Sequence, residues 1–397
     1  MNVTPAMQQY YDLKKQYSDC ILFFRMGDFY EMFSDDAHIA HRVLWIAITS
    51  RNKNSEDPIA LAGIPYHAKQ KYLPLFIHAG YKVAIAEQVS DPKLKWIVKR
   101  EVVRVVTPST LSLESEDYPN SDESQVLLSL SLDNGIYGLS QLNIADNSWK
   151  TSQFNELAKM LEQIYKISPK EVILSKNLFN NSEITETLSK KYSLNMYYFE
   201  LQNNPQKYLC SHFGVKNLAW FGIEDQLWAQ YASAQLLEYI IAHQKWDFSF
   251  LNTLAFDSHS DHLEIDESSM RSLDIIYNFS TGSTLKWTLL GVINDTKTPM
   301  GNRFMREQII APLTDISKIQ QRQDFISELV SDTILLSKLR WELKNISDID
   351  AILNRLALWR ALPRDLLNLK RSLQSIMQIV KIISESGNKK LQKLLQI

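Results

Sequence analysis

The first 110 residues alternate between the two hydrophobic periods that distinguish strands from helices. An apolar run over 21–26 and a period of two over 29–33 predict two strands. Ser34 stands where a helix N-cap is expected, and Asp35 and Asp36 fall in the first turn, where the helix dipole favours acids. Ala37, Ala40, Val43 and Leu44 form the predicted buried stripe of this helix. A second helix is predicted around 69–79, and strands are predicted over 83–86 and 102–106. Together these elements predict a mixed α/β domain.

A second α/β domain is predicted after a polar, acidic stretch over 111–124, whose composition is typical of a linker. Apolar runs over 126–132 and 136–142 flank Asn134-Gly135, a pair that accepts the positive φ of a tight hairpin. A helix over 155–165, a strand over 172–174 and a long helix over 225–243 follow. The apolar side of the long helix is predicted to contain Leu227, Tyr231, Ala234, Leu236, Leu237 and Ile241.

From about residue 255 onward the apolar spacing becomes helical. Asp315 is a predicted N-cap, and Pro363 stands at the start of a helix that extends to Gly387. The predicted fold class is therefore multidomain, with α/β domains followed by a mainly helical region.

Composition and charge favour a cytoplasmic protein over a membrane-spanning or secreted one. No run of 18 apolar residues occurs, and the N-terminus lacks the apolar segment of a signal peptide. Cys20 and Cys210 are the two cysteines and have neither metal nor redox spacing, so we expect a reducing, cytoplasmic setting. The net charge is −2, but Lys and Arg outnumber Asp and Glu over 93–104 and 286–397. Such clusters can attract phosphate, although most are solvated helix faces.

The stretch LFFRMGDFYEMF (22–33) contains the strongest candidate site. Residues two apart in a strand share a face, so Phe29 and Glu31 are predicted to project together while Tyr30 points the other way. A phenylalanine can wedge into a base step, and a carboxylate beside it would meet a base edge rather than repelling phosphate. Periodicity alone leaves a second interpretation open, in which Phe29 is core and Glu31 is a solvated strand residue.

Several ordered motifs make the first interpretation the stronger one. They are TPAMQQYYDLK (4–14), GDFYEMF (27–33), AGIPYHA (62–68), VAIAEQVSDP (83–92), VKREVVRVVTPST (98–110), TPMGNRFMREQIIAPLTD (298–315) and LNRLALWRALPRDL (353–366). In this order they resemble the MutS family of DNA mismatch repair proteins, whose mismatch-reading Phe-x-Glu corresponds to Phe29 and Glu31. The resemblance is weak between about 145 and 250.

The resemblance implies a fold, partners and further site residues. The implied parts are a mixed α/β mismatch-recognition domain (1–110), an acidic linker (111–124), an RNase H-like α/β connector (125–250) and a partial helical core and lever region (251–397). The implied ligand is double-stranded DNA with mismatches or small loops, and the family implies a homodimer, a MutL-type repair partner bound through the connector, and a location in the bacterial cytoplasm on the nucleoid. The implied DNA-binding residues are Phe29, Glu31, Met26, Arg25, Arg51, Lys99 and Arg100.

These residues have different expected roles. Arg51 matches a basic position near the mismatch, and Met26 is expected to line the minor groove. Lys99, Arg100 and Arg104 are candidate phosphate contacts, but the same segment equally alternates as a half-buried strand.

The sequence also departs from the family pattern. Trp45 stands where the family usually has Asp, and Trp96 lies near a customary Gly. No Gly-Lys dipeptide occurs, so there is no P-loop, and we expect neither ATP nor Mg²⁺ to bind this chain and no enzymatic activity. Two rival interpretations remain: the front piece of a MutS ATPase whose remainder is elsewhere, or a repair-partner interaction module that no longer grips DNA.

Overall fold

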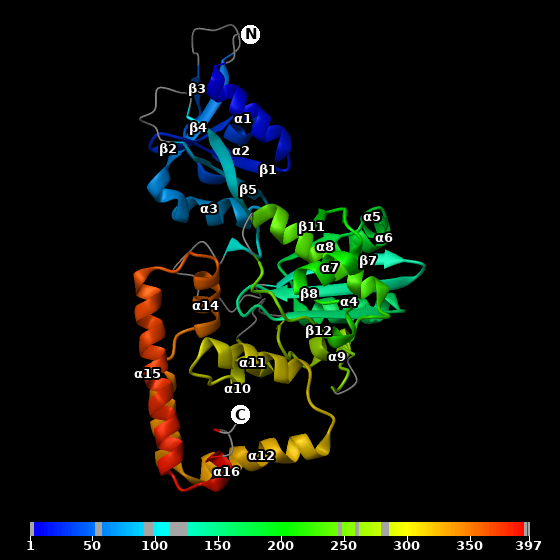
Figure 1. The fold of residues 1–397 in the computed structure, drawn as a ribbon, viewed down its shortest axis with the longest axis vertical. Helices are drawn as coiled ribbons and strands as arrows, with labels where there is room; N and C mark the ends of the chain where they lie inside the picture. The colour runs from blue at the N-terminus through cyan, green and yellow to red at the C-terminus, as the bar shows by residue number, and fades with distance from the viewer. Residues whose placement is uncertain are drawn as a thin grey trace.

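The computed structural model describes residues 4–51, 58–90, 98–111, 126–244, 248–258, 262–278, 286–392 and 395. Two α/β units, each built on a six-stranded sheet, are followed by a region of helices (Figure 1). The predicted combination of α/β units with a helical region is thereby confirmed, whereas the RNase H-like character of the second unit stays a prediction.

The first unit surrounds a sheet with the strand order β3-β4-β2-β1-β5-β6. Strands β1 and β5 are parallel, and the other neighbours are antiparallel. The elements are α1 (Pro5–Gln16), β1 (Cys20–Met26), β2 (Phe29–Phe33), α2 (Asp35–Leu44), β3 (Thr49–Arg51), β4 (Ile59–Pro65), η1 (Tyr66–Ala68), α3 (Lys69–His78), β5 (Lys82–Gln88) and β6 (Arg100–Val106).

Both faces of this sheet are covered, and the strand period assigns residues to each face. Tyr30 and Met32 of β2 pack in one cluster with α2 and α3, whereas Phe33 packs in the other with Met7 and Tyr10 of α1. Because alternate residues point to opposite faces, Phe29 and Glu31 belong to the α1 face together with Phe33.

The start of α2 differs from its prediction. Ser34 precedes the helix as expected, but its side chain makes no capping hydrogen bond, and its φ is 52°. Asp36 is buried and accepts hydrogen bonds from Tyr10 Oη (3.1 Å), Lys14 Nζ (2.8 Å) and the Leu22 amide (3.0 Å). This carboxylate therefore joins α1, β1 and α2, a stronger constraint than a favourable position in the helix dipole.

The second unit has a sheet with the order β11-β10-β7-β8-β9-β12. Its predicted tight hairpin is confirmed: Asp133 pairs with Ile136, and the residues between them, Asn134 and Gly135, have φ of 50° and 77°. The elements are β7 (Val126–Asp133), β8 (Ile136–Asn143), β9 (Trp149–Phe154), α4 (Leu157–Ile167), β10 (Glu171–Leu174), α5 (Lys176–Phe179), α6 (Ser182–Glu186), η3 (Thr187–Lys191), β11 (Asn195–Tyr198), α7 (Pro205–Phe213), η4 (Ala219–Phe221), α8 (Leu227–Gln244) and β12 (Ala255–Phe256).

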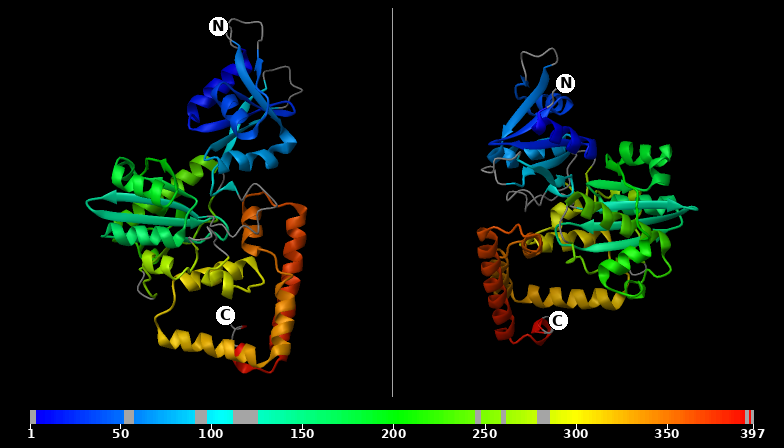
Figure 2. Two further views of the ribbon diagram at one scale, coloured as in Figure 1. Left: turned by 180° about the vertical axis from the view of Figure 1, so that it is seen from behind. Right: turned by 45° about the horizontal axis from the view of Figure 1, so that its top comes forward.

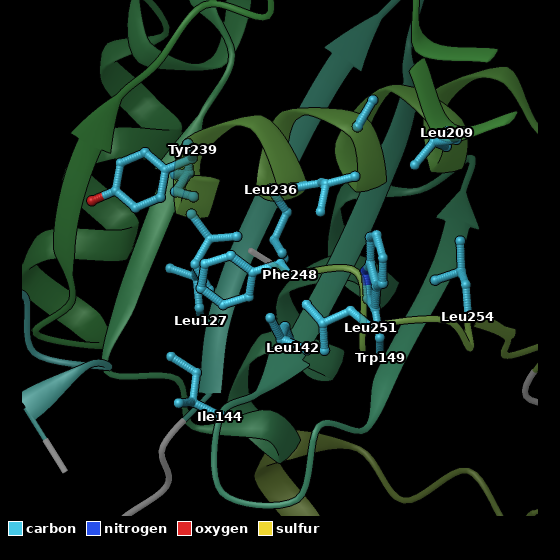
Figure 3. Close-up of a cluster of buried hydrophobic side chains, with 14 of the residues drawn as sticks. Leu127, Leu142, Ile144, Trp149, Leu209, Leu236, Tyr239, Phe248, Leu251 and Leu254 are labelled. Atoms are coloured by element: carbon cyan, nitrogen blue, oxygen red, sulfur yellow. The ribbon is translucent and has the colours of Figure 1, made fainter. Parts of the chain in front are cut away.

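Helix α8 is buried around most of its circumference, which corrects the prediction of a single apolar side. Leu236 and Tyr239 pack over the sheet with Phe248 and Trp149 (Figure 3). The polar Gln235 is also fully buried, where it accepts from Ser129 Oγ at 2.8 Å. In contrast, Leu227, which was predicted to be on the apolar side, is exposed.

In the helical region, α15 runs away from the two sheets and α12 lies crosswise at the end of the molecule farthest from the first sheet (Figure 1 and Figure 2). Asp315 caps α12 and Pro363 is the first residue of α15, as predicted. Arg303 of α11 binds Asp348 through two nitrogens (2.6 and 3.1 Å) and lies 3.5 Å from Asp146 of the second unit. The helices are α9 (Glu267–Ser272), α10 (Leu289–Ile293), α11 (Pro299–Ile310), α12 (Ile316–Ser331), α13 (Thr333–Leu343), α14 (Ile349–Ala357), α15 (Pro363–Glu385) and α16 (Lys389–Gln392). Across the described ranges, none of the helices has the length and apolar character needed to span a bilayer.

Candidate nucleic-acid interface

The candidate site is built on the β1–β2 hairpin, whose turn consists of Gly27 and Asp28. Met26 pairs with Phe29 across this turn, and Gly27 has a φ of 60°, a conformation that glycine adopts without strain. The turn is therefore as short as an antiparallel hairpin allows, and Phe29 is the first residue after it.

Phe29 and Glu31 lie on the same side of β2, at the end of the strand next to the turn. The Phe29 side chain is 48% exposed, whereas Phe33 on the same face is buried under α1. Glu31 is half-buried, with Phe24 opposite it on β1 and Gly63 opposite it on β4. A side chain at position 63 would begin 3.9 Å from Phe29 Cδ1, so glycine leaves the surface beside both residues open.

Arg25 makes its contacts with other groups of the first unit. Its guanidinium carbon lies 3.7 Å from the centre of the Tyr66 ring, its Nε donates to the Gly27 carbonyl, and its Nη1 lies 3.9 Å from Glu87. Glu87 also accepts a hydrogen bond from the buried Tyr30 hydroxyl. Burial, and then this hydrogen bond, raise the pKa of Tyr30, so the hydroxyl stays a donor to Glu87.

The other predicted contacts are distributed between interior and surface. Met26 is half-buried and packs against the α1 cluster. Arg100 is buried, and its guanidinium donates to the carbonyls of Arg25 (2.6 Å) and Val98 (3.0 Å). Lys99 is exposed, 2.5 Å from Glu101.

Arg51 ends β3, where its backbone pairs with Ile59, and its side chain lies outside the described residues. Of the two departures from the family pattern, Trp45 follows α2 with a φ of 58° and is exposed. Trp96 lies outside the described residues.

Tyr66 and Glu87 contribute to this site but were not predicted as site residues. They lie in the motifs AGIPYHA and VAIAEQVSDP, and membership of these ordered motifs is the sequence feature that could have marked them as site residues. Within the described part of the chain, no group of three or more His, Cys, Asp or Glu side chains is placed to hold a metal ion.

The sequence of this chain matches models of a known protein family. Three family models match in succession: MutS domain I over residues 4–115, MutS domain II over 125–252 and MutS domain III over 268–396. The chain belongs to the MutS family. The hairpin with Phe29 and Glu31 thus lies in MutS domain I, and α8 lies in MutS domain II.

Curated MutS proteins align along nearly the whole chain. DNA mismatch repair protein MutS is 36% identical over 394 residues in Methanococcoides burtonii, 37% over 381 residues in Dehalococcoides mccartyi and 34% over 395 residues in Streptococcus sanguinis. These alignments cover 97%, 95% and 99% of this chain but 44% of each relative. The chain therefore spans less than half the length of the MutS proteins it matches.

Proposed function

We propose that this chain recognises mispaired or unpaired bases in double-stranded DNA, as part of DNA mismatch repair. The observation that supports this most directly is the half-exposed Phe29 ring beside Glu31, immediately after a two-residue turn. An apolar wedge unstacks a base step at least cost where pairing is already faulty, and the duplex kinks there. In this proposal Phe29 stacks on one base and Glu31 forms a hydrogen bond with it.

Contacts with the phosphates supply the remaining affinity and depend on salt concentration. Exposed Lys99 is suited to such a contact, and we assign a second to Arg51 on the basis of the family pattern. The contacts made by Arg100 and Met26 within the first unit favour structural roles for these two side chains.

Other properties are proposed from the family alone. They are a homodimer, a MutL-type partner bound through the second unit, and a location in the cytoplasm on the nucleoid. The sequence has no Gly-Lys dipeptide and hence no P-loop, so we assign ATP-dependent signalling to no residue of this chain.

The decisive experiment compares binding of the chain to a G·T heteroduplex and to its matched duplex over a range of salt concentrations. Phe29→Ala is expected to abolish the preference for the mismatch, a loss of roughly 5- to 150-fold in affinity if one base stack of ~1–3 kcal/mol is removed. Weak, salt-dependent binding to both duplexes should remain, because it comes from phosphate contacts.

Phe179→Ala is the matched control, since it removes a phenylalanine of similar exposure from the second unit. It should leave the preference intact. Equal discrimination by wild type and Phe29→Ala would contradict the role of Phe29, and no binding of either duplex by the wild type would favour an interaction module instead.

A further inference from the structure

We propose that Arg25 and Tyr66 form a clamp that fixes the turn of the β1–β2 hairpin and so sets the direction of Phe29. Arg25 is then a positioning residue and does not contact phosphate. This proposal deepens the proposed function and rests on it for its consequences in DNA binding, but the clamp itself is a property of the free protein.

The clamp holds both residues of the turn by their carbonyl groups. Arg25 Nε donates to the Gly27 carbonyl, and the Tyr66 amide donates to the Asp28 carbonyl at 2.9 Å. In an exposed two-residue turn these carbonyls would ordinarily bind water. Here they bind two groups of the same unit, one from β1 and one from η1 after β4.

The two groups are also joined to each other. The guanidinium carbon of Arg25 lies 3.7 Å from the centre of the Tyr66 ring, which is close contact for a cation and an aromatic face. Arg25, the turn and Tyr66 are therefore each in contact with the other two. Moving the turn requires breaking a hydrogen bond or separating the Arg25 guanidinium from the Tyr66 ring.

The charge and burial of Arg25 favour contacts within the protein over a contact with phosphate. Its side chain is only 18% exposed, and Glu87 lies 3.9 Å from Nη1 as a counter-charge. The Arg25 backbone is also held, because Arg100 Nε donates to its carbonyl at 2.6 Å. A phosphate would have to compete with Tyr66, Glu87 and the Gly27 carbonyl for the same guanidinium.

A fixed turn matters because Phe29 follows it directly. A side chain that is ordered before binding loses less conformational freedom when it enters a base step, so the affinity for a mismatch rises without a new contact. Matched DNA, which is held through its phosphates, gains nothing from this order. The clamp is therefore expected to act on discrimination and not on general affinity.

The test uses four variants of the full chain, and the first three concern the clamp itself. Arg25→Lys keeps the charge and loses the planar group, Tyr66→Ala loses the ring, and Tyr66→Phe is the control that keeps the ring; both variants at position 66 keep the backbone amide. Hydrogen exchange of the free protein is measured over 24–33 and at residue 66, and binding to G·T and matched duplexes is measured at several salt concentrations.

We expect Arg25→Lys and Tyr66→Ala to accelerate exchange in the hairpin at least 3-fold while exchange elsewhere in the first unit stays unchanged. Both should lower the ratio of mismatch to matched affinity about 3- to 10-fold with the same salt dependence, and Tyr66→Phe should match the wild type. Because Arg25→Lys keeps the positive charge, a fourth variant, Arg25→Gln, tests the phosphate contact. Its slope of log affinity against log salt should equal that of the wild type, because only a lost phosphate contact lowers it by about one.

Two results would overturn the clamp: hairpin exchange that is the same in wild type, Arg25→Lys and Tyr66→Ala, or a slope that falls by about one in Arg25→Gln. A wild type without mismatch preference would instead refute the proposed function, while the exchange measurements would still decide whether the clamp exists.

Discussion

At the scale of single residues, the strand period places an aromatic ring and a carboxylate together at the end of β2. Phe29 is half-exposed and Glu31 half-buried, and the glycine at position 63 keeps the surface beside them free of a third side chain. A negative charge on a DNA-binding surface weakens attraction to phosphate, so Glu31 is useful only where it meets a base.

Glu31→Gln is therefore expected to retain or raise affinity for matched DNA by a few-fold, because it removes a negative charge near the phosphates while preserving side-chain shape. The measurement is binding to a matched duplex at low salt, where electrostatic effects are largest. Glu183→Gln, at an exposed position of the second unit, is the control and should leave this affinity unchanged. A large loss of matched-duplex affinity in Glu31→Gln would contradict the placement of Glu31 at a base.

At the scale of secondary-structure elements, buried polar groups hold helices against strands. Asp36 of α2 binds the Tyr10 hydroxyl, the Lys14 ammonium and the Leu22 amide, so one carboxylate joins α2 to both α1 and β1. Gln235 of α8 acts similarly in the second unit, where it accepts from Ser129 of β7. Each such group costs stability if its partners are lost, because the remaining donors stay buried.

Asp36→Ala is expected to lower the free energy of unfolding by about 3 kcal/mol, because it leaves the Leu22 amide without its acceptor and leaves the Tyr10 hydroxyl and the Lys14 ammonium with backbone carbonyls alone. Urea denaturation of both proteins at pH 7 measures the difference. Asp35→Ala is the matched control: this neighbouring aspartate is exposed in the same helical turn and should cost under about 1 kcal/mol. Similar losses in the two variants would show that Asp36 acts through the helix dipole and not through its three partners.

At the scale of the whole molecule, the first two units meet through a buried polar cluster. Glu171, at the start of β10, is fully buried, with the Ser109 amide 3.5 Å away, and its Oε1 has no hydrogen-bond partner among the described residues. Lys82 lies 4.2 Å from the centre of the Tyr197 ring, and Gln244 of α8 donates to the Val105 carbonyl at 2.8 Å. Burial raises the pKa of Glu171 to about 7, against the lowering effect of hydrogen bonds from Ser109 and Thr107.

The raised pKa of Glu171 makes the stability of this junction depend on pH. Between about pH 4.5 and 7 the folded protein binds a proton that the unfolded chain has lost, so this residue lowers stability as pH rises through that window. His243 of α8 has the opposite effect, because burial lowers its pKa to about 4, whereas the histidine of the unfolded chain keeps its proton up to its ordinary pKa of 6.5. The two contributions therefore oppose each other between pH 4.5 and 6.5 in the wild type.

Comparison with Glu171→Gln isolates the glutamate. The variant should gain stability relative to wild type as pH rises from 5 to 8, by up to about 3 kcal/mol, because it never buries a charge. Urea denaturation at the two pH values gives this difference. Glu156→Gln, at an exposed position, should give the same difference at both pH values. If the difference in unfolding free energy between Glu171→Gln and the wild type is the same at both pH values, this glutamate ionises as readily in the folded protein as in the unfolded chain.

The sequence by itself determined what depends on local periodicity and local turn chemistry. The shared face of Phe29 and Glu31, the Asn134-Gly135 hairpin and the Asp315 cap follow from residues a few positions apart, so a pattern predicts them. Ordered motifs over 4–110 and 298–366 were sufficient to indicate the MutS family.

Only the tertiary structure decided what depends on neighbours distant in sequence. Arg25 of β1 meets Tyr66 of η1 and Glu87 of the neighbouring β5, Asp36 meets Tyr10 and Lys14, and α8 is enclosed by elements from both units. The helical period shows that a helix has an apolar side, but not how many neighbouring elements will cover it. Likewise, the sequence shows a basic residue beside a turn, but not whether its guanidinium already contacts other groups of the protein. The positions of Arg25 and Arg100 were therefore predictable, while the contacts that their side chains make were not.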